Sequence, residues 1–215
     1  MFRQAAKDFA NKVIRPIIPS MEKNKKIPSD YVNLLFEQGF MSVEVPEKYD
    51  GVGASFRDSL DIVKEISKVD PSTSLLVDIQ NTLIQPIMQK YANDFQKDKY
   101  WPKLASDTVG CFALSEANSG SDAFSLKTKA VKNNDDTWSL SGSKMWISNS
   151  DHGGLFFVFA QTENSDPNIP NYKNIKCFIL ERNTSGFEIS PPENKLGLKS
   201  SATCALHFDN CIVPD

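Results

Sequence analysis

Residues 110–122 read Gly-Cys-Phe-Ala-Leu-Ser-Glu-Ala-Asn-Ser-Gly-Ser-Asp, and the pattern of the chain changes at this stretch. An apolar run enters it, and small and polar residues around Gly120 follow. Small side chains let backbone N–H groups approach a ligand closely, and successive N–H groups in a turn can bind an anion. The pattern therefore predicts a strand, a sharp turn with exposed backbone, and a return to a sheet.

A second stretch, Lys144-Met145-Trp146-Ile147-Ser148, places a large flat ring in an amphipathic run. Taken alone, the turn fits a plain β-turn, and the ring fits an aromatic residue in the core of a sheet. Together they supply the two parts that a flat cofactor with a charged tail needs. A ring stacks on its flat portion, and N–H and O–H groups bind its polar edge. We therefore hypothesise that both stretches line one cofactor cleft.

The composition excludes several classes of protein. The chain has 215 residues, of which 40% are hydrophobic and 24% are charged, as is typical of globular domains. A net charge of −3 without a Lys/Arg-rich block argues against nucleic acid as a partner, and no apolar run reaches the length of a membrane span. Without CxxC spacing, the cysteines (Cys111, Cys177, Cys204 and Cys211) argue against a metal site and favour reduced, partly buried thiols.

The first half of the chain has the apolar spacing of helices. One helix is expected from the N-terminus until Pro16 and Pro19 end it, and a second from residues 28–30 to a C-terminal cap at Gly39. Two further helices have start signals. Ser55 with Asp58 forms a capping box before the apolar positions Leu60, Val63, Ile66 and Val69. Asp70-Pro71 precedes the apolar positions Leu76, Ile79, Leu83 and Ile87, with a kink expected near Pro86, and a short charged helix covers residues 94–100.

From about residue 108 the period changes to the alternation of strands. Strands are expected at residues 127–131, 138–140, 144–148, 155–161, 175–181, 187–189 and 205–213. Residues 133–136, Asn-Asn-Asp-Asp, predict a hairpin turn. Helices followed by strands indicate an α+β protein of two domains: an all-α domain at residues 1–107, and an antiparallel β-barrel or sandwich at residues 108–215.

The same stretches resemble a known family. Residues 112–122 resemble the first signature of the acyl-CoA dehydrogenase family, and residues 142–148 resemble the strand that follows it there. Residues 192–199 and Val213-Pro214 also fit, so the resemblance covers the chain. It implies a helical N-terminal domain, a middle β domain, a C-terminal four-helix domain, and FAD-dependent removal of two hydrogens from an acyl-CoA thioester. Residues 79–84 and 145–149 most resemble the short/branched-chain members of mitochondria.

The resemblance also implies roles for individual residues. The residues that would line the flavin are Phe112, Ala113, Leu114, Ser115, Glu116, Ala117, Asn118, Ser119, Gly120, Ser121, Trp146, Ile147 and Ser148. Trp146 would pack on the isoalloxazine, and Ser148 would hydrogen-bond near N5. Ser121 and Tyr172 would contact the acyl-CoA. Electrons would pass to electron-transfer flavoprotein, in fatty acid or branched-chain amino acid catabolism, and full-length members form homotetramers of the mitochondrial matrix.

Two departures from the family pattern shape the expectation. Asn118 stands where the family usually has Gly, and Asn tolerates a positive φ. The chain stops at Asp215, where the family continues into the bundle that carries the catalytic Glu, and no mitochondrial presequence is visible. We therefore expect a truncated chain with no catalytic base, weak FAD binding, little turnover and an exposed apolar surface. Glu116 is interpreted as structural, because accepting turn N–H bonds would lower its pKa.

Three alternatives remain open. An acyl-CoA oxidase-type flavoprotein would pass the electrons to oxygen instead. A non-catalytic fragment would bind FAD or acyl-CoA and act as a scaffold. A hydrolytic triad of Ser148, Asp151 and His152 would need a spatial geometry that neighbouring positions in a sequence do not establish.

Overall fold

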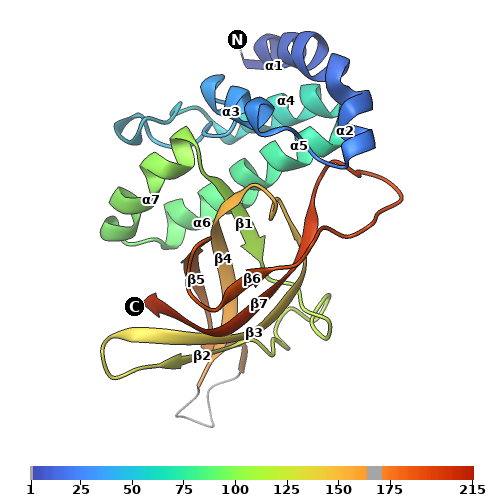
Figure 1. Cartoon of the computed structure of the whole chain (residues 1–215). Coiled ribbons are helices and arrows are strands. Elements are labelled where there is room, and N and C mark those ends of the chain that lie inside the picture. Colours follow the sequence, from blue (N-terminus) through green and yellow to red (C-terminus); the bar gives the residue numbers. More distant parts are fainter. Residues whose placement is uncertain (1, 164–170) are drawn as a thin grey trace. The chain divides into compact units, whose positions relative to one another are not determined.

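The computed structural model describes residues 2–163 and 171–215, apart from the side chains of residues 171 and 172 (Figure 1). The chain divides into two units. The first comprises Met1–Gly110 and Asn194–Ala202, and the second comprises Cys111–Glu193 and Thr203–Asp215. Within the described residues, every helix is too short or too polar to span a bilayer. All four cysteines are free thiols, and three of them are buried, as expected from the sequence.

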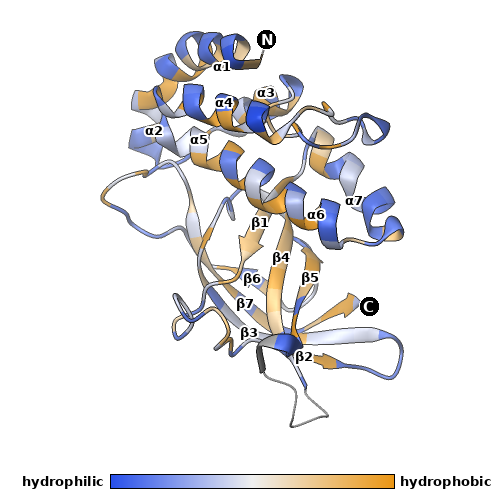
Figure 2. Ribbon diagram, turned by 180° about the vertical axis from the view of Figure 1, so that it is seen from behind, coloured by the Kyte–Doolittle hydropathy of each residue, from blue (hydrophilic) through white to orange (hydrophobic). Residues whose placement is uncertain are grey.

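The first unit is built from helices. Its elements are α1 (Phe2–Phe9), η1 (Ala10–Ile14), η2 (Arg15–Ile17), α2 (Ile18–Asn24), α3 (Ser29–Glu37), η3 (Glu47–Tyr49), α4 (Phe56–Ser67), α5 (Pro71–Asp78), η4 (Ile79–Ile84), α6 (Gln85–Tyr91) and α7 (Asp94–Ser106). In Figure 2 these helices alternate between hydrophobic and hydrophilic residues, which is the pattern of helices that bury one face. The core includes Phe9, Ile14, Leu35, Phe40 and Ile66.

The prediction that Pro16 and Pro19 end the first helix is wrong. The helical path continues to Asn24 and ends at Lys25, which has a φ of 51°. Each proline occupies one of the first two positions of a new segment, η2 or α2, where its missing N–H is not required. The segment η1, which directly precedes them, has π-helical hydrogen bonding, so the helical path continues although the prolines donate no backbone hydrogen bond.

The predicted caps are confirmed. Ser55 and Asp58 form a capping box at the start of α4, and Gly39 has a φ of 71° just beyond α3. Asp70 precedes α5, and its carboxylate accepts hydrogen bonds from the Thr73 backbone N at 2.7 Å and the Thr73 hydroxyl at 2.6 Å.

Replacing Asp70 with Ala should lower the free energy of unfolding by about 1–2 kcal/mol, because a buried helix start then loses its acceptor. Urea denaturation followed by circular dichroism measures this loss. Asp70→Asn is the matched control, since Asn caps helices about as well as Asp and should stay within about 0.5 kcal/mol of wild type. Equal losses in both variants would contradict the capping role.

Two predicted core positions are exposed instead. Leu60 is 47% exposed, because α4 turns Ser59, Ile62 and Ile66 to the core. Leu83 is 38% exposed, because it lies in η4, a π-helical segment that directly precedes the expected kink at Pro86. The wider π turn rotates the buried face away from the spacing of a regular α-helix.

Two buried amides, Asn81 and Gln85, lie on the same helical path beside the buried Leu76 and Ile79. Asn81 donates to the backbone O atoms of Phe40 and Val77, each at 2.8 Å, and accepts from Val43 N at 3.1 Å. Gln85 donates to Met41 O at 2.8 Å. These bonds hold residues 40–44, the segment after α3, against the helix. The side chains come from the helix, and the backbone groups that they bind come from the segment.

The second unit carries the sheet. Its elements are β1 (Val109–Ala113), which spans the boundary between units, β2 (Lys129–Lys132), β3 (Thr137–Ser148), β4 (Gly153–Thr162), η5 (Asn171–Asn174), β5 (Ile175–Glu181), β6 (Phe187–Ile189) and β7 (Thr203–Pro214). The strand order is β1-β4-β2-β3-β7-β6, and β5 pairs with β4. The hairpin expected at residues 133–136 connects β2 to β3.

The order of helices before strands is confirmed, but the arrangement of the strands differs from the prediction. The described strands form one mixed sheet of seven strands rather than a closed antiparallel barrel or a sandwich. The chain reverses after β2 and again after β3, so β4 runs parallel to β2. The core of this sheet includes Phe156, Val158, Leu180 and Leu206, and β4 and β5 are largely hydrophobic in Figure 2.

Candidate functional site

The stretch that follows β1 forms a closed turn. Glu116 N donates to Ser119 O at 3.0 Å, and Ser119 N donates to Glu116 O at 3.1 Å. Ala117 and Asn118 are exposed at the tip of this turn. Asn118 has a negative φ, so the turn needs no left-handed residue at the position where the sequence departs from the family pattern. The turn therefore presents backbone and an amide side chain to solvent.

A buried ion pair holds this turn against neighbouring segments of the chain. The Glu116 carboxylate accepts hydrogen bonds from the Lys127 N at 2.6 Å and the Thr128 N at 3.1 Å. It also pairs with the Lys144 Nζ at 2.7 Å, and that ammonium donates to Leu114 O at 3.0 Å. Glu116 is 4% exposed and Lys144 is fully buried. One carboxylate thus joins three segments of the chain, and the Lys144 contact is one that the sequence reading missed.

Burial and hydrogen bonding act on this pair in opposite directions. Burial alone would raise the pKa of the Glu116 carboxyl, but the bonds from Lys144, Lys127 and Thr128 hold that pKa below its ordinary value. Burial lowers the pKa of the Lys144 ammonium, although the Glu116 carboxylate opposes this shift. The interpretation of Glu116 as a structural carboxylate of lowered pKa is confirmed, and a group of this kind is a weak base.

A β-bulge in β3 contains the exposed Trp146. Lys144 pairs with Leu206 and Ile147 pairs with Cys204, so Met145 and Trp146 together face one residue of β7. Trp146 has a φ of 58° and is 58% exposed, whereas its neighbour Ile147 is 2% exposed. A left-handed backbone is uncommon for a bulky residue, and such strain is concentrated at functional sites. Bulges next to active sites commonly re-aim a side chain.

The bulge and the turn are in direct contact. Met145 N donates to Ser115 O at 2.8 Å, so an amide at the bulge binds the turn segment. A cavity of about 380 Å³ opens beside this contact and is lined by Glu116, Ala117, Asn118, Lys127, Thr128, Gly142, Ser143, Lys144, Met145, Ala205 and His207. Gly142 has a φ of 145°, and a Cβ there would come within 2.7 Å of the Thr128 Cα. Glycine therefore allows β3 to approach the segment before β2.

The predicted site residues fall into three groups. The Phe112 ring lies 5.0 Å from that of Phe159, and the side chains of Ala113 and Ile147 belong to the core, so the latter two offer only backbone atoms to a ligand. Leu114, Ser115, Glu116, Ala117, Asn118 and Ser119 form the turn and its entry, and the Ser119 hydroxyl donates to Asp122 O at 2.7 Å. Gly120, Ser121 and Trp146 are exposed, and Ser148 is half-buried.

Ser148 ends β3 with an available side chain. Among the residues that the structure describes, no hydrogen bond involves its hydroxyl. The structure therefore does not join Ser148 to His152 in a catalytic pair, and the His152 Nε2 lies 3.3 Å from the Asp151 carboxylate instead. Tyr172 lies in η5, but its side chain is outside the described residues.

His207 also lines this cavity, and it lies in the strand that the sequence predicts at residues 205–213. Its Nδ1 lies 3.1 Å from the Ser143 hydroxyl, and its Nε2 lies 3.0 Å from the Ser190 hydroxyl. The alternation of β7 does place this side chain on the exposed face, but nothing in the sequence shows that β3 passes beside it. Within the described ranges, no cluster of three or more His, Cys, Asp or Glu residues could hold a metal ion.

Comparisons with known proteins match both halves of the chain. The family model described as acyl-CoA dehydrogenase, N-terminal domain, matches residues 1–108, and that described as acyl-CoA dehydrogenase, middle domain, matches residues 111–211. The short/branched chain specific acyl-CoA dehydrogenase, mitochondrial, of Rattus norvegicus is 45% identical over 215 residues, which are 100% of this chain and 49% of that protein. The chain spans about half the length of the curated relatives it matches.

Two solved structures extend the comparison to the fold. One, described as an electron transferring flavoprotein of Acidaminococcus fermentans, matches with a TM-score of 0.93 and 31% identity, over 100% of this chain and 55% of that chain. The other, an acyl-CoA dehydrogenase complexed with FAD from Bacillus anthracis, matches with a TM-score of 0.88 and 29% identity, over 100% of this chain and 36% of that chain.

Proposed function

Because this chain belongs to the acyl-CoA dehydrogenase family, we propose that it forms the flavin-binding half of an enzyme that oxidises the Cα–Cβ bond of an acyl-CoA. Its 45% identity to the short/branched-chain relative supports a short or 2-methyl-branched acyl group as substrate. The name of that relative also supports a mitochondrial location. The observation that carries the proposal is the exposed, strained Trp146 beside the backbone-rich turn.

The residues present fit the family cofactor, FAD. The Trp146 indole is 58% exposed on a backbone conformation that costs free energy, which is the arrangement expected of a ring held ready to stack on a flat partner. Ser148 has an available hydroxyl two residues further along β3. The exposed tip at Ala117 and Asn118 offers a further polar edge. These groups would hold the flavin, and the exposed Ser121, with Tyr172, would contact the acyl-CoA.

When bound, FAD supplies the chemistry of accepting a hydride from the β carbon of the thioester. The residues of this chain bind and orient the reactants around it. Trp146 would stack on the ring system, and Ser148 would donate a hydrogen bond at its edge. The ion pair of Glu116 and Lys144 positions the turn, and the Ser115–Met145 contact joins the turn to the bulge.

The proton on the α carbon must go to a general base. Glu116 does not fit this role, because its carboxylate is buried, accepts three hydrogen bonds from Lys127, Thr128 and Lys144, and has a lowered pKa. We propose that the base is a residue outside residues 1–215. We further propose electron-transfer flavoprotein as the electron acceptor and a homotetramer as the assembly of the complete enzyme. Residues 1–215 by themselves would turn over slowly.

The engagement of Glu116 also favours a second candidate function, a non-catalytic module that binds FAD or acyl-CoA. Titration of the chain with each ligand, followed by catalytic assay with 2-methylbutanoyl-CoA and an artificial electron acceptor, distinguishes the two. Turnover at the rate of a complete dehydrogenase would contradict the proposal that the base lies elsewhere. Formation of hydrogen peroxide would favour an oxidase.

Replacing Trp146 with Ala should weaken FAD binding by about tenfold, because the stacking surface is lost. Of the three tryptophans, Trp101 and Trp138 are buried, so quenching of tryptophan fluorescence by FAD reports chiefly on Trp146. Flavin absorbance measures the affinity in all variants.

Trp146→Phe is the matched control, since a smaller ring keeps the stacking and should cost less than about threefold in affinity. If Trp146→Ala bound FAD as tightly as wild type, the exposed Trp146 would no longer support the flavin proposal.

A further inference from the structure

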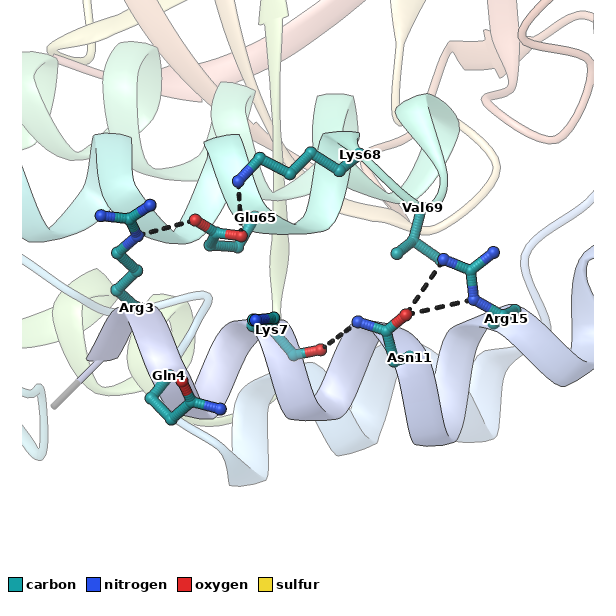
Figure 3. Close-up of a pocket in the computed structure, with 8 residues that line it drawn as sticks. All are labelled: Arg3, Gln4, Lys7, Asn11, Arg15, Glu65, Lys68 and Val69. Atoms are coloured by element: carbon teal, nitrogen blue, oxygen red, sulfur yellow. Dashed lines mark hydrogen bonds and ion pairs between the residues drawn. The ribbon is translucent and has the colours of Figure 1, made fainter.

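A second cavity, of about 590 Å³, lies in the helical unit between the N-terminal helical path and the end of α4 (Figure 3). Its volume is typical of sites that bind a ligand. The cavity shares no residue with the turn, the bulge or their cavity, and the proposed dehydrogenation makes no use of it. Arg3, Gln4 and Lys7 come from α1, and Glu65 from α4.

The lining of this cavity is strongly basic. It contains four basic side chains, Arg3, Lys7, Arg15 and Lys68, against the single carboxylate of Glu65. The chain as a whole has a net charge of −3. Positive charge is therefore gathered locally on an acidic protein, and a cleft lined by one sign of charge attracts ligands of the other sign.

The Glu65 carboxylate organises two of these cations. It is 3% exposed and lies 2.7 Å from both the Lys68 Nζ and the Arg3 Nε. Hydrogen bonds from Lys68 and Arg3 lower the pKa of Glu65 to about 2, so it stays ionised near neutral pH. Arg3 uses only its Nε in this contact, and the rest of its guanidinium fork remains available to an incoming carboxylate.

The other two cations, Lys7 and Arg15, form no ion pair with a carboxylate in the described residues. The Asn11 Oδ1 accepts from the Nε and Nη2 of Arg15 at 3.2 and 3.0 Å, and the Asn11 amide donates to Lys7 O at 2.8 Å. A neutral side chain thus orients Arg15 without neutralising it. In the described part of the chain, no hydrogen bond or ion pair involves the Lys7 Nζ. Lys7 and Arg15 are eight positions apart, which corresponds to about 12 Å along a helix.

We propose that this cationic groove, lined by Arg3, Lys7, Arg15 and Lys68, binds an acidic peptide segment of a partner protein. Cations spread along one helix face match carboxylates spread along an extended chain, and arginine forks favour planar carboxylates. No aromatic ring occurs among the described lining residues, so nothing there would stack on a nucleobase. This inference does not depend on the proposed enzyme activity.

Binding of a fluorescein-labelled peptide of Glu and Gly residues to the whole chain, measured by fluorescence anisotropy at low salt, tests the groove. Lys7→Glu should weaken binding by about tenfold, because one attraction becomes a repulsion. Lys12→Glu is the matched control: it makes the same charge change at an exposed position of the same helical path outside the lining, and should cost less than about twofold. Arg15→Gln, which only removes a charge, should weaken binding by about threefold.

Four outcomes would overturn the proposal. The first is absence of peptide binding at low salt, and the second is an equal loss in Lys7→Glu and Lys12→Glu. The third is equal affinity for a peptide with Gln in place of Glu. The fourth is tighter, Lys7-dependent binding of inorganic polyphosphate or a single-stranded oligonucleotide, which would assign the groove to phosphate. Circular dichroism checks that the variants remain folded, as expected for substitutions of exposed side chains.

Discussion

Lys144→Met should lower the free energy of unfolding of this chain by about 3–5 kcal/mol, the largest stability loss expected from any single substitution considered. The Lys144 ammonium is fully buried, and its Nζ lies 2.7 Å from the Glu116 carboxylate. Removing it leaves a buried carboxylate without its counter-charge and deprives Leu114 O of its donor. Methionine keeps much of the volume, so the loss reports on charge rather than on a cavity.

Urea denaturation measures this loss, and two variants isolate its cause. Lys129→Met removes an exposed lysine from the neighbouring strand β2 and should change stability by less than about 0.5 kcal/mol. Combining Lys144→Met with Glu116→Gln removes both charges and should recover part of the lost stability. If the double variant is as unstable as the sum of both single variants, the pair is not coupled and the expectation is wrong.

The pH dependence gives the same pair a second signature. The pKa of Glu116 is lower in the folded chain than its ordinary value, so the folded state holds fewer protons than the unfolded state in mildly acidic solution. The stability contributed by Glu116 is therefore fully present above its unfolded pKa and is lost as the pH falls through its folded pKa. The double variant should lose less stability than wild type over this range.

Asn81→Leu should destabilise the helical unit by about 2–4 kcal/mol. The substitution leaves Phe40 O and Val43 N without their side-chain partner in a buried position, and each unsatisfied group costs about 1–3 kcal/mol. Asn81 is fully buried, so water cannot replace the amide. The midpoint of urea denaturation, read by circular dichroism at the helical signal, should fall accordingly.

Leu83→Asn is the matched control for this expectation. It exchanges the same two residue types in the opposite direction on the same π-helical segment, at a position that is 38% exposed. It should change stability by less than about 0.5 kcal/mol. If Leu83→Asn lost more unfolding free energy than Asn81→Leu, the apolar side chain at position 83 would matter more to this helix than the buried amide at position 81, and the expectation would be wrong.

Elements with a local start or stop signal could be predicted from the sequence. The capping box of Ser55 and Asp58, the cap at Asp70, the glycine at position 39 and the hairpin after β2 all depend on residues within a few positions of one another. The stability of a cap or a turn depends on residues a few positions apart, so a short sequence motif is enough to predict it.

The centre of the candidate site depends on pairing between distant segments, and there the prediction was incomplete. Period-two alternation counted back from the buried Ile147 would turn Met145 inward and Lys144 outward. The bulge opposite β7 inserts one residue into that count, which buries Lys144, whereas the exposure of Trp146 agrees with the alternation. A bulge is decided by the partner strand, and the partner strand lies more than fifty positions away. The stacking role proposed for Trp146 stays a prediction.

The carboxylate of Glu116 also has a consequence for how this protein can change. It holds the backbone N–H groups of Lys127 and Thr128, so both ends of the loop at residues 117–126 are fastened to one buried point. Exposed positions of that loop, such as Asn118 and Ser121, can then change without disturbing the strands on either side. Evolution, or a laboratory library restricted to the exposed positions of this loop, can therefore vary the rim of the candidate site while the sheet stays unchanged.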